Sequence, residues 1–381
     1  MKNKMANCAL GVMFGLAVLL RYAGLHFESK DMFYDFLTWY QQLADGGYKV
    51  LIQSSFSYTP PYLYLLYLST FTKSFLSAIV AIKLIPIFFD VCNTFIVYKI
   101  VRIKYPWGKL PILAAAVFAL APTVILNSAY WGQVDSFYTC FLLVCMYFVL
   151  RNKPLPALLF FGVAFAIKAQ AAFLGPFLIL MALKKRIPWM QFSLVLIVYL
   201  LLVLPTILLG KPVLSVLTVY AVQAGAFPAA SMNAPNLYIF VPPVAYLPAV
   251  IIGLSIAAML VILWLFIYGR RYFPLTSSLL IYLALISVAC TPFLLPKMHE
   301  RYFYPADVFS ILLAFFLPDL WFVAVGFQAV SLLTYSVFLF DQNPVPNLIL
   351  ATILNTGLVI ILLWKQDRLF KNLPDLEQER T

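Results

Sequence analysis

The chain has 381 residues, of which 64% belong to the apolar set and only 10% are charged, and its mean hydropathy is +0.95. A soluble domain of this length cannot bury that much apolar surface in one core, so the composition excludes an ordinary soluble protein. No polar stretch is long enough to form a separate soluble domain, and we expect one transmembrane domain over residues 1–381.

Apolar segments along the chain predict an all-α polytopic membrane protein with about 12 transmembrane helices. In chain order, the expected spans are 6–25, 77–98, 110–127, 136–150, 155–168, 171–183, 190–209, 244–267, 274–293, 304–317, 319–340 and 345–364. We expect the first of them to be a retained helix rather than a cleaved signal peptide, because it lacks a clear small-residue cleavage site.

The basic residues give the orientation. With the N-terminus in the cytoplasm, most of the 26 Lys and Arg residues fall in cytoplasmic connections, such as 184–186 and 270–271, and in the C-terminal tail. This is the positive-inside bias, and it predicts that both termini are cytoplasmic. The formal charge of +12 is thereby explained as a topology signal, and no nucleic-acid partner is expected.

Two extracytoplasmic loops are long, at about 26–76 and 210–243. In the first, Pro60 and Pro61 open an apolar run that falls short of a full span before Lys73. Because proline favours the first turn of a helix, we expect an interfacial or re-entrant helix over 60–73. Segments 155–168 and 171–183 are also short, and they predict a helical hairpin with residues 168–170 at its outer turn.

Several ionisable residues lie inside expected spans. Lys83 and Asp90 are seven residues apart, about two helical turns, and we interpret them as a structural pair that Arg21 can join. Buried charges of this kind can alternatively line a transport pathway.

Two acids follow the first span. Asp31 and Asp35 stand four residues apart, so a helix would place both on one face. For an arbitrary pair, a helix cap or solvated loop acids would be the simpler interpretation. A carboxylate beside a membrane-facing cleft is, however, also what a general base requires.

A second polar run, residues 127–135, connects two expected spans and contains Trp131, Gln133 and Asp135. Taken alone it indicates a polar turn with an interfacial aromatic anchor. Lys168 and Gln170 are different, because a lysine close to hydrocarbon is costly without a partner or an anion. Snorkelling and a binding role remain equal alternatives for Lys168.

The densest polar cluster is residues 296–305, which contains Lys297, His299, Glu300, Arg301 and Tyr302. An interfacial belt usually holds one or two such residues, so we favour a binding site. Arg, Lys and His together suit a phosphate, with Arg supplying paired donors. No Walker-type loop, dinucleotide fingerprint or nucleophile elbow is present, and two histidines offer little material for zinc.

These motifs resemble, in order, those of the GT-C superfamily of polytopic glycosyltransferases that use polyprenyl-phosphate sugars. The chain looks closest to bacterial relatives of the GPI-anchor second mannosyltransferase, and more distantly similar to the dolichyl-phosphate-glucose glucosyltransferases. The segments that carry the resemblance are 31–40, 58–66, 131–135, 168–170, 233–238 and 299–305. Each is weak alone, and the six in order are fairly specific.

The resemblance implies a GT-C-like bundle with an elaborated first extracytoplasmic loop, in the bacterial inner membrane. It implies inverting transfer of mannose or another hexose from a polyprenyl-phosphate donor to a lipid or glycan acceptor at the extracytoplasmic face. Asp31 would be the base, with substrate contacts from Asp35, Gln133, Asp135, Lys168, Gln170, His299, Glu300, Arg301 and Tyr302. Preorganised cations would stabilise the departing phosphate, so the scheme calls for no metal or other cofactor.

A transporter or lipid flippase is the competing function, with Arg21, Lys83, Asp90 and Lys168 lining a pathway. Against it, the sequence shows no internal repeat of the kind that often builds alternating access, and the polar clusters fall on one side. A noncatalytic scaffold would leave the costly ionisable residues unexplained.

Overall fold

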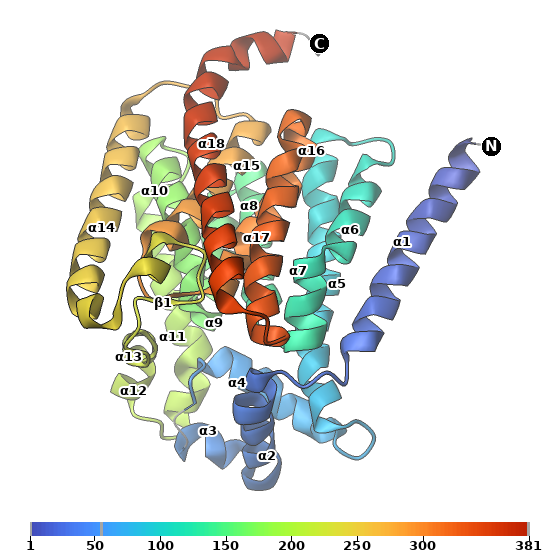
Figure 1. Ribbon diagram of the computed structural model, residues 1–381, viewed down its shortest axis with the longest axis vertical. Coiled ribbons are helices and arrows are strands. Elements are labelled where there is room, and N and C mark those ends of the chain that lie inside the picture. The colour runs from blue at the N-terminus through green and yellow to red at the C-terminus, as the bar shows by residue number, and fades with distance from the viewer. Residues whose placement is uncertain (1, 54–55, 379–381) are drawn as a thin grey trace. The chain divides into compact units, whose positions relative to one another are not determined.

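The computed structural model describes residues 2–53 and 56–378, which divide into two compact units (Figure 1). Unit 1 comprises residues 1–172 and 189–227, and unit 2 comprises residues 173–188 and 228–381. Nearly all of the described secondary structure is helical, and a two-residue strand pair is the one sheet found among these residues.

Unit 1 contains α1 to α9 and α11 to α13. Its α-helices are α1 (Lys2–Gly24), α2 (Leu37–Gly46), α3 (Val50–Gln53), α4 (Pro60–Ser69), α5 (Ala78–Lys104), α6 (Leu110–Leu120), α7 (Pro122–Ile125), α8 (Asp135–Leu150), α9 (Pro154–Ile167), α11 (Ser193–Leu208), α12 (Val213–Leu217) and α13 (Val219–Gly225). There are also two π-helical turns: η1 (Met32–Phe36) begins directly after Asp31, and η4 (Leu126–Trp131) includes residues 127–131 of the polar run 127–135. Both α2 and α4 pack against α5, at the end of the unit where α5 begins (Figure 1).

Unit 2 contains the remaining α-helices and both strands. They are α10 (Gly175–Leu183), β1 (Ser231–Met232), α14 (Tyr246–Arg270), α15 (Ser277–Leu294), β2 (Met298–His299), α16 (Tyr304–Phe316), α17 (Trp321–Leu339) and α18 (Pro344–Gln378). The strands β1 and β2 pair in parallel, with Ser231 opposite Met298 and Met232 opposite His299. Helices α17 and α18 pack along each other (Figure 1).

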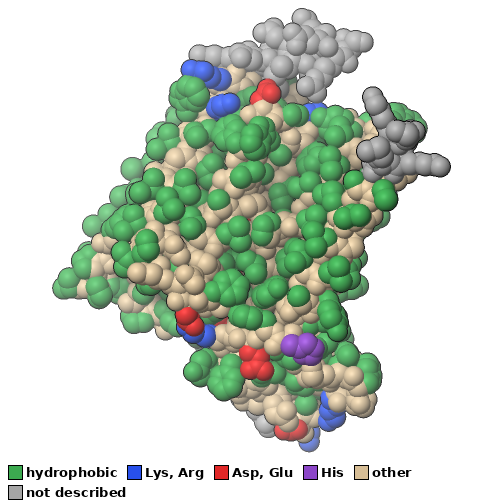
Figure 2. Space-filling view, turned by 45° about the vertical axis from the view of Figure 1, so that its right-hand side comes forward, with side chains coloured by type: hydrophobic (Ala, Val, Ile, Leu, Met, Phe, Trp, Pro, Cys, Tyr) green, Lys and Arg blue, Asp and Glu red, His purple; other side chains and the backbone are tan. Residues whose placement is uncertain are grey.

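Among the described residues, seven helical segments are long and apolar enough to cross a bilayer. They are Asn7–Gly24, Ala78–Lys104, Trp189–Leu208, Pro243–Arg270, Ser277–Leu294, Pro318–Leu339 and Pro344–Phe370. Large apolar side chains such as Val18, Ile251 and Ile262 are more than half exposed, and hydrophobic side chains cover much of the face shown in Figure 2. The chain is therefore a multi-pass, predominantly α-helical membrane protein.

The expected span 110–127 is a bent pair of helices. Leu110–Leu120 and Pro122–Trp131 meet at 50°, and together they would make an eighth span. The break falls at Ala121, whose backbone is extended (φ −56°, ψ 123°) because the following Pro122 disfavours the helical conformation of the residue before it.

The other four expected spans form helices, but these are short. Helices α8, α9, α10 and α16 have 16, 14, 9 and 13 residues. At about 1.5 Å per residue even the longest reaches roughly 24 Å, less than the ~30 Å hydrocarbon core. Twelve spans therefore remain a prediction.

Helix α4 begins at Pro60, as the two prolines predict. Thr59 precedes it in extended conformation, and the helix ends after ten residues at Ser69. A ten-residue helix is about 15 Å long and too short to span a bilayer. The choice between an interfacial and a re-entrant position stays open.

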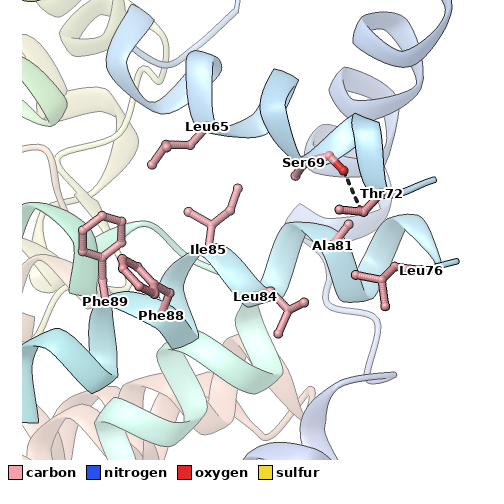
Figure 3. A pocket seen from close by; sticks show the side chains of 9 residues that line it. All are labelled: Leu65, Ser69, Thr72, Leu76, Ala81, Leu84, Ile85, Phe88 and Phe89. Carbon is pink, nitrogen blue, oxygen red and sulfur yellow. Dashed lines mark hydrogen bonds between the residues drawn. The ribbon is translucent and has the colours of Figure 1, made fainter. Parts of the chain in front are cut away.

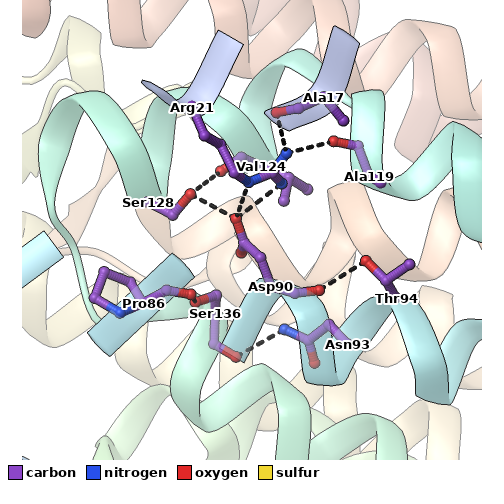
Figure 4. Close-up of polar contacts among 10 residues, drawn as sticks. All are labelled: Ala17, Arg21, Pro86, Asp90, Asn93, Thr94, Ala119, Val124, Ser128 and Ser136. Atoms are coloured by element: carbon purple, nitrogen blue, oxygen red, sulfur yellow. Dashed lines mark hydrogen bonds and ion pairs between the residues drawn. The ribbon is translucent and has the colours of Figure 1, made fainter. Parts of the chain in front are cut away.

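The structural pair predicted from Lys83 and Asp90 is wrong in its partners. Arg21 donates to Asp90 Oδ2 from Nε (3.0 Å) and Nη2 (2.9 Å), and Ser128 Oγ donates to the same oxygen at 2.5 Å (Figure 4). Lys83 instead donates to the backbone carbonyls of Gly24, the last residue of α1, and of Phe27, three residues beyond it. Two turns of one helix separate Lys83 from Asp90 by about 10 Å, so the carbonyls at and just after the end of α1 are nearer.

Surface labelling tests the predicted orientation. We expect Ala226→Cys to react with a membrane-impermeant maleimide added outside intact cells, and Arg186→Cys to react only after permeabilisation, because the basic residue distribution places 184–186 inside. Both positions are exposed. The five native cysteines set the background, which the unsubstituted chain measures. Reversed labelling would contradict every assignment of a residue to the outer face.

Candidate functional site

Asp31 enters the site through the connection that follows α1. The Ser29 hydroxyl accepts a hydrogen bond from Met32 N (3.1 Å) and donates one to the carbonyl of Trp131 (3.1 Å). This single side chain therefore caps the start of the η1 turn and ties it to the η4 turn, which lies about 100 residues further along the chain. Asp31 is half-buried between the two turns.

Two donors hold the Asp31 carboxylate. Trp131 Nε1 donates to Asp31 Oδ2 at 2.9 Å, and Gln133 Nε2 donates to the same oxygen. Between them, Gly132 has a left-handed backbone (φ 78°) that L-residues with a Cβ rarely adopt. The tight turn at Gly132 thus brings both donors to one carboxylate oxygen and fixes its orientation.

The network continues into the aromatic residues of the first loop. The Tyr58 hydroxyl donates to Gln133 Oε1 at 2.9 Å, so Gln133 bridges Tyr58 and Asp31. The Tyr58 ring lies 5.0 Å from the Tyr62 ring and 5.6 Å from the Trp39 ring, between centroids. Burial raises the pKa of the Tyr62 phenol, which therefore stays neutral. These packed rings make a rigid wall beside the carboxylate.

Lys168 and Asp135 form a buried ion pair next to this wall. Lys168 Nζ lies 2.5 Å from Asp135 Oδ1, and Asn127 Nδ2 donates to Asp135 Oδ2 at 3.0 Å. The Lys168 ammonium also faces the rings of Tyr58 and Tyr138, 5.8 and 5.7 Å from their centroids. Asp135 lies in the first turn of α8, where the helix dipole favours a negative charge. A buried ion pair with Asp135 therefore describes Lys168, which is 6% exposed, better than snorkelling does, and its binding role stays a prediction.

Asp35 is in a different environment from Asp31. It is exposed, whereas Asp31 is half-buried. Both residues lie at the start of the first loop. The hydrogen bonds from Trp131 and Gln133 go to Asp31. This difference favours Asp31 over Asp35 as the residue of a built site.

Gln170 lies half-buried in the short 3₁₀ segment Ala169–Leu174. Its Oε1 atom is shielded from solvent and has no hydrogen-bond partner within the described part of the chain. A buried amide oxygen without a partner is costly and suits a ligand donor.

The second predicted cluster lies in unit 2, at the end of β2. His299 belongs to the strand, and a 3₁₀ turn (Glu300–Phe303) follows it. Arg301 Nη1 lies 3.7 Å from Glu300 Oε1, and the His299 and Tyr302 rings are 5.1 Å apart between centroids. Glu300 is buried, whereas His299, Arg301 and Tyr302 are partly accessible.

The 233–238 motif supports this cluster from within the same unit. Asn236 Nδ2 donates to the carbonyls of Pro292 (3.3 Å) and Leu295 (3.2 Å), and the Tyr238 hydroxyl donates to that of Leu294 (2.9 Å). These are carbonyls at the C-terminal end of α15, which have no partner within their own helix. The motif therefore fixes where α15 ends and where β2 begins.

The structure thus groups the predicted residues within each unit. Unit 1 brings Asp31 to Gln133 and Asp135 to Lys168, with Tyr58 linking the two pairs. Unit 2 groups residues 299–302. Sequence reasoning did not find the roles of Trp131, Tyr58 and Asn127; Trp131 is fully buried and is not an interfacial anchor. The polar run 127–135 was the available signal, but its partners lie too far along the chain to be paired from one sequence.

An apolar groove lies between α4 and the first half of α5. Its volume is about 270 Å³, and Leu65, Phe88 and Phe89 line one end (Figure 3). Two hydroxyl residues also line it, but each donates to a backbone carbonyl of its own helical segment, Ser69 Oγ to Leu66 (2.7 Å) and Thr72 Oγ1 to Ser69 (2.7 Å). Because both hydroxyl groups already donate to backbone carbonyls, the groove offers an apolar lining that suits a hydrocarbon chain.

The groove is close to the polar site along two elements. Leu65 is three residues beyond Tyr62 on α4, and Phe89 stacks on Phe137, 4.1 Å between centroids. Phe137 itself lies two residues beyond Asp135 on α8. On α4 one helical turn therefore separates the groove-lining Leu65 from Tyr62, and on the other side Phe137 connects the groove-lining Phe89 to the helix that carries Asp135.

In the described residues, no group of three or more His, Cys, Asp or Glu side chains is placed to hold a metal ion. Comparison with protein-family models finds no match to this chain, and comparison with curated proteins finds none either.

Proposed function

We propose that the chain is an inverting membrane glycosyltransferase with its active site at the extracytoplasmic face. It transfers mannose or another hexose from a polyprenyl-phosphate donor to a lipid or glycan acceptor. The observation that carries the proposal is the Asp31 carboxylate, which Trp131 and Gln133 both hold through Oδ2 beside a buried ion pair. A fixed carboxylate at the edge of apolar helices is suited to act as a general base on a lipid-linked substrate.

In the proposed reaction, Asp31 accepts the proton of an acceptor hydroxyl as its oxygen attacks the anomeric carbon of the donor sugar. The bond from that carbon to the polyprenyl phosphate breaks, and the phosphate leaves with the electron pair. One displacement inverts the anomeric configuration. The apolar groove beside α4 supports a lipid-linked substrate, because its lining suits a hydrocarbon chain and lies one turn from the polar site.

The departing phosphate needs positive charge close to it. The Lys168–Asp135 ion pair changes which residues we assign to that role. Lys168 is neutralised by Asp135 at 2.5 Å, so the Lys168–Asp135 pair contributes little net charge. We assign the phosphate contact first to Arg301 and His299, which are partly accessible; Arg301 lies 3.7 Å from Glu300, a much longer contact than that between Lys168 and Asp135. Lys168 and Gln170 then contribute hydrogen-bond donors and acceptors to the sugar or phosphate.

Arg301 variants test this assignment. We expect Arg301→Ala to weaken binding of a polyprenyl-phosphate hexose roughly 10- to 100-fold, because a hydrogen bond to a charged group contributes about 1.5–3 kcal/mol. Arg301→Lys should restore little if the contact is bidentate. Isothermal titration of the purified protein in detergent measures the affinity.

Arg271→Ala is the matched control. Arg271 also pairs with an acid, Asp367 at 2.6 Å, but that pair is exposed and is expected to have no role in the site. Donor affinity in Arg271→Ala should equal that of the wild type. Wild-type affinity in Arg301→Ala would remove Arg301 from the phosphate site.

A further inference from the structure

Lys83 is a lysine in the apolar helix α5 with no solvent exposure at all. Its ammonium donates to the carbonyl of Gly24 at 2.7 Å and to that of Phe27 at 2.5 Å. An ionisable residue inside a membrane helix is costly, and it persists when it serves a specific partner. Here the hydrogen-bond partners are backbone carbonyls of Gly24 and Phe27, and the charge of Glu28 in the same connection also attracts the ammonium. The side chain of Lys83 therefore holds the connection that follows α1.

The Gly24 carbonyl belongs to the last residue of α1, and the Phe27 carbonyl lies three residues beyond it. Helix α1 stops at Gly24, and the last carbonyls of a helix have no partner within it. A lysine near these carbonyls satisfies them and complements the negative end of the helix dipole. Lys83 therefore caps α1 from a neighbouring helix and fixes the point at which the chain leaves the span towards Asp31.

The same end of α1 presses against the turn that binds Asp31. A Cβ added at Gly24 would lie 2.5 Å from the ring of Tyr130, the residue before Trp131, so only glycine permits this approach. A Cβ added at Gly132 would lie 2.5 Å from Met32 Cε and 3.5 Å from Lys83 Cγ. Lys83, the end of α1 and the turn at Gly132 are thus closely packed against one another.

We propose that Lys83 is a positioning residue for Asp31. It holds the end of α1, and with it the connection 25–30, in the register that delivers the Asp31 carboxylate to Trp131 and Gln133. The inference rests on the proposed role of Asp31 as the base, but the clamp itself is a property of the fold. The two parts are tested separately.

Hydrogen exchange tests the clamp without any assay of activity. In Lys83→Met, which keeps the length of the side chain and removes its donors, amides of residues 25–36 should exchange faster than in the wild type, because local opening becomes easier. Unchanged protection of 25–36 would overturn the clamp. If residues 25–36 exchange faster in Lys83→Met but the wild-type protein transfers no sugar from the donor, the proposed function is refuted and the clamp still stands.

Kinetics test the consequence for Asp31. For Lys83→Met, kcat per folded molecule should fall roughly 10- to 100-fold with the donor KM changed less than about twofold, because a displacement of about 1 Å far from the chemistry can cost that much. A merely structural lysine would lower the yield of folded protein and leave this kcat unchanged. An unchanged kcat would therefore overturn the positioning role even if exchange increased.

Lys184→Met is the matched control. Lys184 also donates to two backbone carbonyls near a helix end, those of Gly269 (3.2 Å) and Arg271, but it does so in unit 2. It should leave both the exchange of 25–36 and kcat unchanged. If Lys83→Met does not fold, Lys83→Gln replaces it, because the Gln side chain keeps an amide NH₂ that can donate. Its kcat should be lower than that of the wild type, and residues 25–36 should exchange faster. Wild-type values of both kcat and exchange would overturn the proposal.

Discussion

Replacing Asp31 by Asn should reduce sugar transfer by about two to four orders of magnitude, the usual contribution of a general base, while donor binding survives. The amide oxygen of Asn can still accept from Trp131 and Gln133, which both donate to one carboxylate oxygen. The shape of the site is therefore kept, and the ability to take a proton is lost. Transfer and donor binding are measured separately on purified protein whose folding is checked by thermal shift.

Asp35→Asn is the control for this prediction. Asp35 is exposed and lies one turn further along the chain, so its replacement should have a mild effect through the packing of the loop. Transfer at a near wild-type rate in Asp31→Asn would show that the catalytic assignment is wrong. Loss of transfer in Asp35→Asn alone would move the base to that residue.

The second large effect concerns stability. Arg21→Met should lower the free energy of unfolding by about 3–5 kcal/mol, because it leaves the buried Asp90 carboxylate without its cation. Asp90 is 1% exposed, and Arg21 also donates to the carbonyls of Ala17 (3.1 Å) and Ala119 (2.7 Å), joining three helical segments (Figure 4). Unfolding in detergent with increasing denaturant measures the change.

Two further variants identify the cause. The double variant Arg21→Met, Asp90→Leu should recover most of the lost stability, since removing both charges of a buried pair is often neutral. Arg271→Met breaks the exposed pair with Asp367 and should cost about 0–1 kcal/mol. A double variant as unstable as Arg21→Met would mean that the unpaired charge is not the reason.

Sequence alone predicts the parts of this fold that depend on local pattern. Apolar length identifies the long spans, and Pro60 marks where α4 begins. The short apolar helices are not resolved in the same way, because a run of 9 to 16 residues fits a partial span, a re-entrant segment or a buried helix equally well. The break at Ala121 shows a further limit of prediction from sequence. The apolar segment predicts that a helix is present, but it does not predict the 50° angle between its two halves.

The partners within the site are harder to predict for a physical reason. Asp31 and Trp131 are 100 residues apart in sequence, and their contact depends on the π-helical turn and the left-handed Gly132 that aim both side chains. Lys83 was expected to pair with Asp90, but its hydrogen-bond partners are backbone carbonyls, which every residue possesses and no sequence pattern marks. The residue types of the site were therefore predictable, and their pairing was not.

Transfer by the purified protein in liposomes tests the proposed glycosyltransferase activity most directly. Labelled polyprenyl-phosphate mannose and polyprenyl-phosphate glucose are supplied as donors, with a polar lipid extract from bacterial membranes as acceptor, and the anomeric configuration of the product is determined by NMR. We expect one donor to yield a glycosylated product of inverted configuration, and Asp31→Asn to yield none. Folded wild-type protein that transfers neither sugar, yet moves the labelled lipid across the bilayer, would contradict the proposal and establish a transporter instead.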